Sequence, residues 1–148
     1  MSHPATVIAG HDGTSRGLDA IAHAQRIAAD RDARVVAVHV IEPQMPFTGI
    51  DAHYQHQQRD RATNVLTPVR EAFGSSVETR LVSATTAPAG LREAAEDEHA
   101  VVVVVGPSHH GPVGQVLYGD VARWLTTHCD CLVDVAPVGE HAAADERL

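Results

Sequence analysis

Five short apolar runs, rich in valine and other β-branched residues, recur along this chain with helical segments between them. β-Branched side chains favour strands because they fit a pleated, half-buried surface. The clearest run is VVVVV at residues 101–105, which leads directly into a glycine-rich loop. The pattern predicts five strands, over residues 6–10, 34–41, 77–82, 100–105 and 131–136.

Four segments with helical spacing separate these strands. Thr14 or Ser15 is available to cap the first helix, and Pro88 suits the first turn of the third. The second helix is expected over about residues 51–73. The inward stripes are expected to be Leu18, Ile21, Ala22 and Gln25; Ala62, Val65, Leu66, Val69 and Phe73; Leu91, Ala94 and Ala95; and Leu117, Val121, Trp124, Leu125 and His128.

Strict alternation of strand and helix predicts parallel strands that are joined by right-handed crossovers. The expected fold is therefore α/β, an open five-stranded parallel sheet with helices on both faces. A chain of 148 residues suits one domain, which we place at residues 1–138. The polar residues 139–148 are expected to form a disordered tail.

Charge and composition exclude several classes of partner. The chain has 19 acidic and 11 basic residues, all of the latter Arg, for a net charge of −8. Such a chain repels nucleic acid, and without Lys it cannot contain a P-loop. No segment has the ~18 apolar residues that cross a bilayer, and the first residues do not resemble a signal peptide. We expect a cytoplasmic protein with no membrane partner.

Ligands of open parallel sheets bind at the carboxyl ends of the strands. Three stretches follow such ends here: HDGTS, HVIEP and GPSHHGPVGQ. The fourth helix should begin near Gly119 and direct its backbone N–H groups to the same place, where an anion is favoured.

Longer stretches carry a family resemblance. VIAGHDGTSRGLDAIAHAQRIA, VVAVHVIEP and VVVVVGPSHHGPVGQVLYGDVARWLTTHCDCLVDV resemble universal stress proteins in order and spacing, over residues 7–137. The resemblance implies a Rossmann-like fold of the adenine nucleotide alpha hydrolase type, with strand order 3-2-1-4-5. It also implies a homodimer through the last strand, in a family that has ATP-binding and non-binding members.

The family's nucleotide motif is Gly, two residues, Gly, nine residues, and Gly followed by Ser or Thr. Gly106 and Gly119 match its first and last Gly, but His109 replaces the second Gly and Asp120 the hydroxyl residue. The resemblance further implies that Asp12 contacts adenosine and that Val40 contacts adenine. The candidate nucleotide-binding residues are Gly10, His11, Asp12, Val40, Gly106, His109, Gly119, Asp120 and Val121.

The two departures weaken the nucleotide interpretation. If the backbone at His109 requires a positive φ, replacing Gly costs about 1 kcal/mol. Asp120 places a carboxylate where a phosphate would bind. Either Asp120 caps the fourth helix and takes its N–H groups, or a Mg²⁺ ion bridges Asp120 to the phosphates. The cap is favoured, so ATP or AMP is expected to bind weakly or not at all.

The predicted function is thus a dimeric stress-response or signalling domain that binds rather than catalyses. Two alternatives stay open: ATP or AMP binding with Mg-bridged phosphates, and a pH-responsive interaction protein that uses its 11 His. No catalytic residue is assigned, because Ser108 beside His109 lacks the third group of a triad. Slow ATP hydrolysis would first require nucleotide binding.

Other polar clusters have simpler interpretations. His53, His56 and Asp60 share a helix face and are expected to be solvated. Cys129 and Cys131 are expected to pack as small apolar residues, so no metal site is predicted. Asp134, within the fifth strand, either faces solvent or weakens strand pairing.

Overall fold

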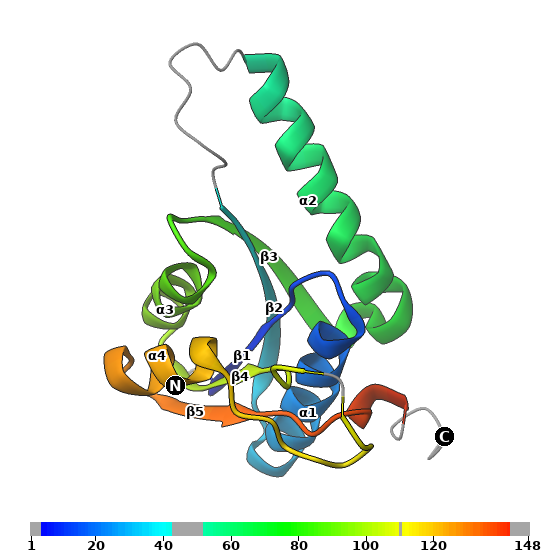
Figure 1. Ribbon diagram of the computed structural model, residues 1–148, viewed down its shortest axis with the longest axis vertical. Helices are drawn as coiled ribbons and strands as arrows, with labels where there is room; N and C mark the ends of the chain where they lie inside the picture. Colours follow the sequence, from blue (N-terminus) through cyan, green and yellow to red (C-terminus); the bar gives the residue numbers. More distant parts are fainter. Residues whose placement is uncertain (1–3, 43–51, 110, 143–148) are drawn as a thin grey trace.

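Five parallel strands form one sheet in the order β3-β2-β1-β4-β5, which confirms the predicted fold class and strand order (Figure 1). This computed structural model describes residues 4–42, 52–109 and 111–142. β3 is one residue longer than predicted, and β5 is one residue shorter at each end. The strands are β1 Thr6–Gly10, β2 Arg34–Ile41, β3 Val77–Ser83, β4 Ala100–Val105 and β5 Leu132–Val135.

Within the described ranges, four α-helices and one 3₁₀ turn connect the strands. Thr86 caps α3 by accepting a hydrogen bond from the N–H of Ala89 at 3.2 Å, and proline lies in the first turn, as predicted. α2 continues through Pro68. The helices are α1 Ser15–Arg31, α2 Ala52–Phe73, α3 Ala87–Asp97 and α4 Asp120–His128, with the 3₁₀ turn η1 at Gly74–Ser76. None of the helices within the described ranges is long and apolar enough to cross a membrane.

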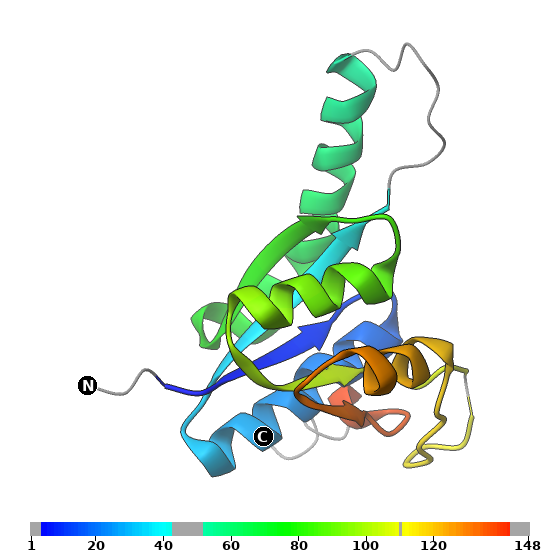
Figure 2. The same cartoon turned by 90° about the vertical axis from the view of Figure 1, so that its left-hand side faces the viewer.

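The core consists of two layers, one on each face of the sheet. α1 and α2 cover one face, and α3 and α4 cover the other, as Figure 2 shows. Alternate valines of β4 serve the two layers: Val102 and Val104 face α1, whereas Val103 and Val105 face α3 and α4. Both faces of the central strands are therefore buried, which explains why the run from 101 to 105 shows no alternation.

The inward face of α4 differs from the prediction. Ala122 and Leu125 are its buried residues, whereas Val121 is exposed. Leu117 lies before the helix, which begins only at Asp120. Trp124 is half-buried and stacks on His128 with ring centroids 4.0 Å apart. The predicted stripe was therefore confirmed at Leu125 and wrong at Val121, an apolar residue that faces a pocket described below.

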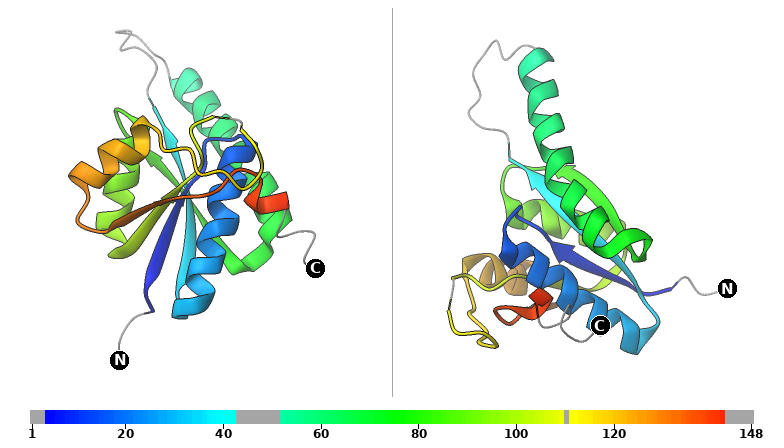
Figure 3. Two further views of the ribbon diagram at one scale, coloured as in Figure 1. Left: turned by 60° about the horizontal axis from the view of Figure 1, so that its bottom comes forward. Right: turned by 90° about the vertical axis from the view of Figure 1, so that its right-hand side faces the viewer.

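The described chain continues in packed form beyond residue 138. Gly139 has a φ of 82°, Glu140 is buried, and the turn lies beside α1 (Figure 3). The predicted disordered tail thus includes four residues, 139–142, that pack on the domain. Residues 143–148 lie outside the described ranges.

Candidate functional site

One pocket of about 730 Å³ opens at the carboxyl end of the sheet. Its walls come from the ends of β1, β2 and β4, from the loop between β4 and α4, and from the first turns of α1 and α4. The structure brings all nine predicted site residues to it. These are Gly10, His11, Asp12, Val40, Gly106, His109, Gly119, Asp120 and Val121.

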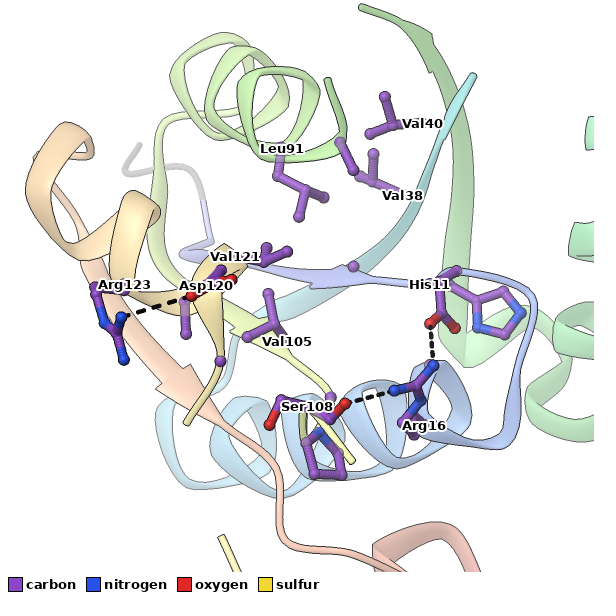
Figure 4. A pocket seen from close by; sticks show the side chains of 18 of the residues that line it. His11, Arg16, Val38, Val40, Leu91, Val105, Ser108, Asp120, Val121 and Arg123 are labelled. Atoms are coloured by element: carbon purple, nitrogen blue, oxygen red, sulfur yellow. Dashed lines mark hydrogen bonds and ion pairs between the residues drawn. The ribbon is translucent and has the colours of Figure 1, made fainter. Parts of the chain in front are cut away.

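One half of the pocket is an apolar slot. Val38 and Val40 of β2, Leu91 of α3, Val105 of β4 and Val121 of α4 surround it (Figure 4). These side chains lie on the face of the sheet that α3 and α4 cover. The slot suits a flat apolar group, because burying apolar surface from both the ligand and the wall is favourable.

The other half of the pocket is polar and lies at the start of α4. Gly119 is the N-cap residue, with extended backbone at φ −116°, and no side chain caps the helix. The first N–H groups of α4 and the positive end of its dipole are therefore available to an anion. The predicted cap by Asp120 is wrong. The Asp120 carboxylate is 100% exposed and pairs with Arg123 at 3.5 Å, and it accepts no hydrogen bond from those N–H groups.

His109 causes no backbone strain. Among the described residues, those with a side chain and a positive φ are Asp32 and His99, which lie at the opposite end of the fold from the pocket. The condition for the penalty at position 109, a positive φ, is therefore not met. His109 lines the pocket as an exposed polar side chain, and His110 lies outside the described residues.

Asp12 is fixed as a carboxylate. Its Oδ1 accepts hydrogen bonds from the Thr14 N–H at 3.0 Å and the Thr14 hydroxyl at 2.6 Å. Arg16 lies 3.8 Å from its other oxygen. Burial alone would raise the pKa of Asp12, but these Thr14 hydrogen bonds and the Arg16 charge outweigh it and hold the pKa below its ordinary value. Asp12 therefore faces a ligand as an acceptor of hydrogen bonds.

His11 is the buried neighbour of Asp12, with 5% of its surface exposed. Its ring packs so tightly against α1 that a Cβ on Gly17 would lie 2.1 Å from Nδ1. Burial lowers the pKa of His11, and the charge of Asp12 offsets only part of this effect. The ring is therefore neutral at neutral pH. Its backbone carbonyl accepts a hydrogen bond from Nδ1 of His39 at 2.8 Å, which ties β1 to β2.

Two arginines at the pocket were missed by the sequence analysis. Arg16 donates from Nη1 to the Ser108 carbonyl at 2.6 Å and so links α1 to the loop after β4 (Figure 4). Arg123 pairs with Asp120, as described above. For Arg123 the signal is its position three residues after Asp120, because such a pair shares a helix face. For Arg16 the signal is its position in the first turn of the helix that follows Asp12.

Two glycines permit close approach between protein segments. A Cβ on Gly106 would lie 2.2 Å from the Arg16 carbonyl oxygen, and one on Gly119 would lie 2.5 Å from Cβ of Ser108. Both positions exclude larger residues whether or not a phosphate is bound. The glycines therefore shape the pocket, and on their own they do not demonstrate a phosphate site.

The other predicted clusters lie apart from the pocket. His56 and Asp60 are exposed and 3.6 Å apart, as the solvated interpretation requires, and the side chain of His53 lies outside the described residues. Cys129 and Cys131 pack against the α3 and α4 layer, and burial raises the pKa of Cys129 to about 11. No group of three His, Cys, Asp or Glu side chains in the described ranges could hold a metal ion.

Comparison with known proteins identifies the family of this chain. The model of the universal stress protein family matches residues 5–137. The Universal stress protein MJ0531 of Methanocaldococcus jannaschii is 27% identical over 139 residues, which cover 87% of this chain and 81% of the relative.

Solved structures show the same fold. A universal stress protein family structure from Burkholderia pseudomallei is 24% identical with a TM-score of 0.69, and the match covers 90% of this chain and 96% of that one. A universal stress protein in complex with cAMP is 24% identical with a TM-score of 0.58, over 92% and 98% of the two chains. The family match and the shared fold agree: this chain belongs to the universal stress protein family.

Proposed function

We propose that this chain is a cytoplasmic stress-response domain whose pocket binds an adenine nucleotide with a single phosphate, and that ATP binds more weakly. The proposal depends on one observation: the same pocket contains an apolar slot and the N-terminus of α4, which no side chain caps. Its volume lies within the range of about 300–1,000 Å³ that is usual for small-molecule sites. The related structure in complex with cAMP supports a ligand of this class.

The two halves of the pocket suggest how the nucleotide lies. The base would occupy the slot between Val40 and Leu91, and the ribose hydroxyls would donate to the Asp12 carboxylate. The phosphate would accept hydrogen bonds from the first N–H groups of α4, which no side chain uses. The apolar base, the ribose hydroxyls and the charged phosphate would thus each contact a part of the pocket with complementary chemistry.

Asp120 is the reason for preferring one phosphate. A chain of three phosphates would extend the negative charge along the mouth of α4, where this carboxylate lies. Because Asp120 is exposed and paired with Arg123, water and the guanidinium screen part of the repulsion. We therefore expect ATP to be disfavoured relative to AMP rather than excluded.

A Mg²⁺ ion could reverse this preference by joining Asp120 to the phosphates. Asp120 could supply one carboxylate oxygen, and Mg²⁺ sites often combine one or two carboxylates with substrate phosphates and water. The exposed Asp120 carboxylate could coordinate Mg²⁺, but its ion pair with Arg123 would have to break first. In this alternative ATP with Mg²⁺ binds more tightly than AMP.

Equilibrium dialysis of the whole chain against AMP and ATP, with and without Mg²⁺, tests the proposal. We expect saturable AMP binding that Asp12→Ala abolishes and weaker ATP binding in both conditions. Asp120→Ser should raise ATP affinity about tenfold while AMP affinity changes less, and Asp130→Ser, an exposed site outside the pocket, is the control. Absence of saturable AMP binding would overturn the proposal, and ATP binding that needs Mg²⁺ would favour the alternative.

We further propose that the domain acts by binding rather than turnover, as a homodimer through β5. β5 is the edge strand next to β4, and Leu132 on it is 63% exposed. The carboxylate of Asp134 has a partner within the chain, since its Oδ2 lies 3.0 Å from Nε2 of His23 on α1. An exposed edge with an apolar side chain is stabilised by a second copy.

A further inference from the structure

Asp19 is a buried carboxylate on α1 that takes no part in the pocket. Only 3% of the residue is exposed. Its Oδ2 accepts from the Gly139 N–H at 3.0 Å, and its Oδ1 accepts from the His141 N–H at 3.0 Å and contacts Nδ1 of the His141 ring. All of these hydrogen bonds come from the turn that follows β5. Hydrogen bonds to an ionised acceptor are among the stronger ones in proteins.

The same face of α1 holds this turn at a second point. Glu140 is buried, and its Oε1 accepts from Nη1 of Arg26 at 2.6 Å. His23 lies between the two anchors, with Nδ1 3.6 Å from the same oxygen. Asp19, His23 and Arg26 are spaced four and three residues apart and so share one helix face. The turn is fixed to α1 rather than trailing from β5.

The loop between β4 and α4 is here called the glycine loop (described residues 106–109 and 111–119). The turn after β5, which α1 holds in place, forms hydrogen bonds with this loop. The Gly114 N–H donates to the Val138 carbonyl at 2.8 Å, and the Val138 N–H donates to the Gln115 carbonyl at 2.9 Å. Within the described residues, these are the backbone hydrogen bonds by which the tip, 111–117, reaches outside the loop. Val113 also lies against the turn, since a Cβ on Gly139 would be 3.0 Å from its Cγ1.

The tip is connected to the pocket through the base of the same loop. The Ser108 N–H donates to the Leu117 carbonyl at 3.0 Å, which closes the base. Both sides of this closed base line the pocket: Gly106, Pro107, Ser108 and His109 on one side, and Tyr118 and Gly119 on the other. A displacement of the tip therefore changes the spacing of residues around the ligand.

We propose that residues 137–142 form a strap that orders the glycine loop before a ligand arrives, and that Asp19 is the positioning residue that anchors it. A loop that is already ordered loses less conformational entropy when it closes on a ligand, so the strap increases affinity without touching the ligand. The effect on nucleotide affinity rests on the proposed function. The effect on loop order does not.

Two variants break the strap at different points. Asp19→Ala removes the anchor and leaves Val138 unchanged. Val138→Pro removes the N–H that donates to Gln115 and leaves Asp19 unchanged. Proline suits this position, because Glu140 N–H donates to the Pro137 carbonyl at 3.3 Å and Gly139 has a φ of 82°, the arrangement of a type II turn with position 138 second. Asp30→Ala, an exposed aspartate on the same helix, is the matched control.

Amide hydrogen exchange of the whole chain without nucleotide is the first measurement. We expect exchange at Gly114 to become about tenfold faster in Asp19→Ala, while amides of β1 and β4 keep their protection. Val138→Pro should have the same effect on Gly114 without speeding exchange at Gly139. Unchanged exchange at Gly114 in both variants would overturn the strap, as would a uniform acceleration across the sheet.

AMP affinity is the second measurement. We expect both variants to bind AMP about tenfold more weakly than the wild type and Asp30→Ala. Faster exchange at Gly114 with unchanged AMP affinity would overturn the positioning role of Asp19. If the wild type binds no AMP but Gly114 responds as expected, the strap stands and the proposed function fails.

Discussion

His11 and Asp12 are adjacent in the chain and occupy different environments at the mouth of one pocket. His11 is buried against α1 and Asp12 is exposed beside Thr14 and Arg16. Both pKa values are lowered, so the pair consists of a neutral imidazole and a carboxylate at neutral pH. At neutral pH the pair therefore carries one negative charge, on Asp12.

The lowered pKa of His11 predicts a specific pH dependence. The unfolded state binds a proton near the ordinary value of about 6.5, whereas the folded state does so only at lower pH. The resulting stability is present above that value and is lost as the pH falls through the folded pKa. An NMR titration should show the His11 ring titrating below 6.5.

Urea denaturation provides a second measurement of the same effect. The free energy of unfolding should decline less between pH 7 and pH 5 in His11→Gln than in the wild type. His56→Gln, on the exposed part of α2, is the matched control for the loss of one imidazole. A His11 ring that titrates above 6.5 would contradict this account of its burial.

At the scale of the elements, the bounds of the strands could be predicted closely from the sequence. The buried face of a helix was harder to predict. β1, β2 and β4 have the predicted bounds because β-branched runs of this length have few other uses. The sequence also predicted that Asp12, Val40 and Gly119 lie at one site, because the carboxyl ends of parallel strands meet at the same edge of the sheet. Val121 misled the prediction of α4, because an apolar residue that faces a pocket cannot be distinguished by type from one that faces the core.

The contacts of charged residues were the least predictable. Asp120 stands at a helix start, where a cap was reasonable, but the side chain pairs with Arg123 instead. Asp19 resembles any polar residue of a surface helix until the turn after β5 covers it. Its partners lie about 120 residues away in sequence, so no local pattern could identify them.

Val121 and Leu125 lie one turn apart on α4 but differ in burial, so their substitution by alanine should change stability by different amounts. Leu125→Ala should lower the free energy of unfolding by about 2–5 kcal/mol, because it leaves a cavity between α4 and the sheet. Val121→Ala should change stability by less than about 1 kcal/mol, because Val121 is exposed in the pocket wall. Urea denaturation of both variants measures the difference. A larger loss for Val121→Ala would contradict the observed orientation of α4.

At the scale of the whole molecule, the two sheet edges differ in what covers them. β3 carries Arg80, which pairs with Asp97 at 2.7 Å, and Glu78, which pairs with Arg34 at 2.7 Å. Charged side chains of this kind discourage strand addition at an edge. β5 instead exposes the apolar side chain of Leu132, so of the two edges β5 is the one suited to pairing with a second copy.

Sedimentation of the whole chain tests this dimer. The wild type should sediment at twice the chain mass of 15.7 kDa. Leu132→Asp should sediment as a monomer, because it replaces the exposed apolar side chain of the edge strand with a charge. Val116→Asp, an exposed apolar position on the glycine loop, is the control and should remain dimeric. A wild type that sediments as a monomer at micromolar concentrations would refute β5 pairing.

The turn at Gly139 also determines where this domain can be engineered. A reporter or purification peptide joined beyond residue 142 leaves the carboxylate of Asp19 covered by the same donors. A fusion made at residue 138 would remove those donors and open a charged recess to water. Splicing of this domain into larger proteins should therefore retain the four residues after Val138.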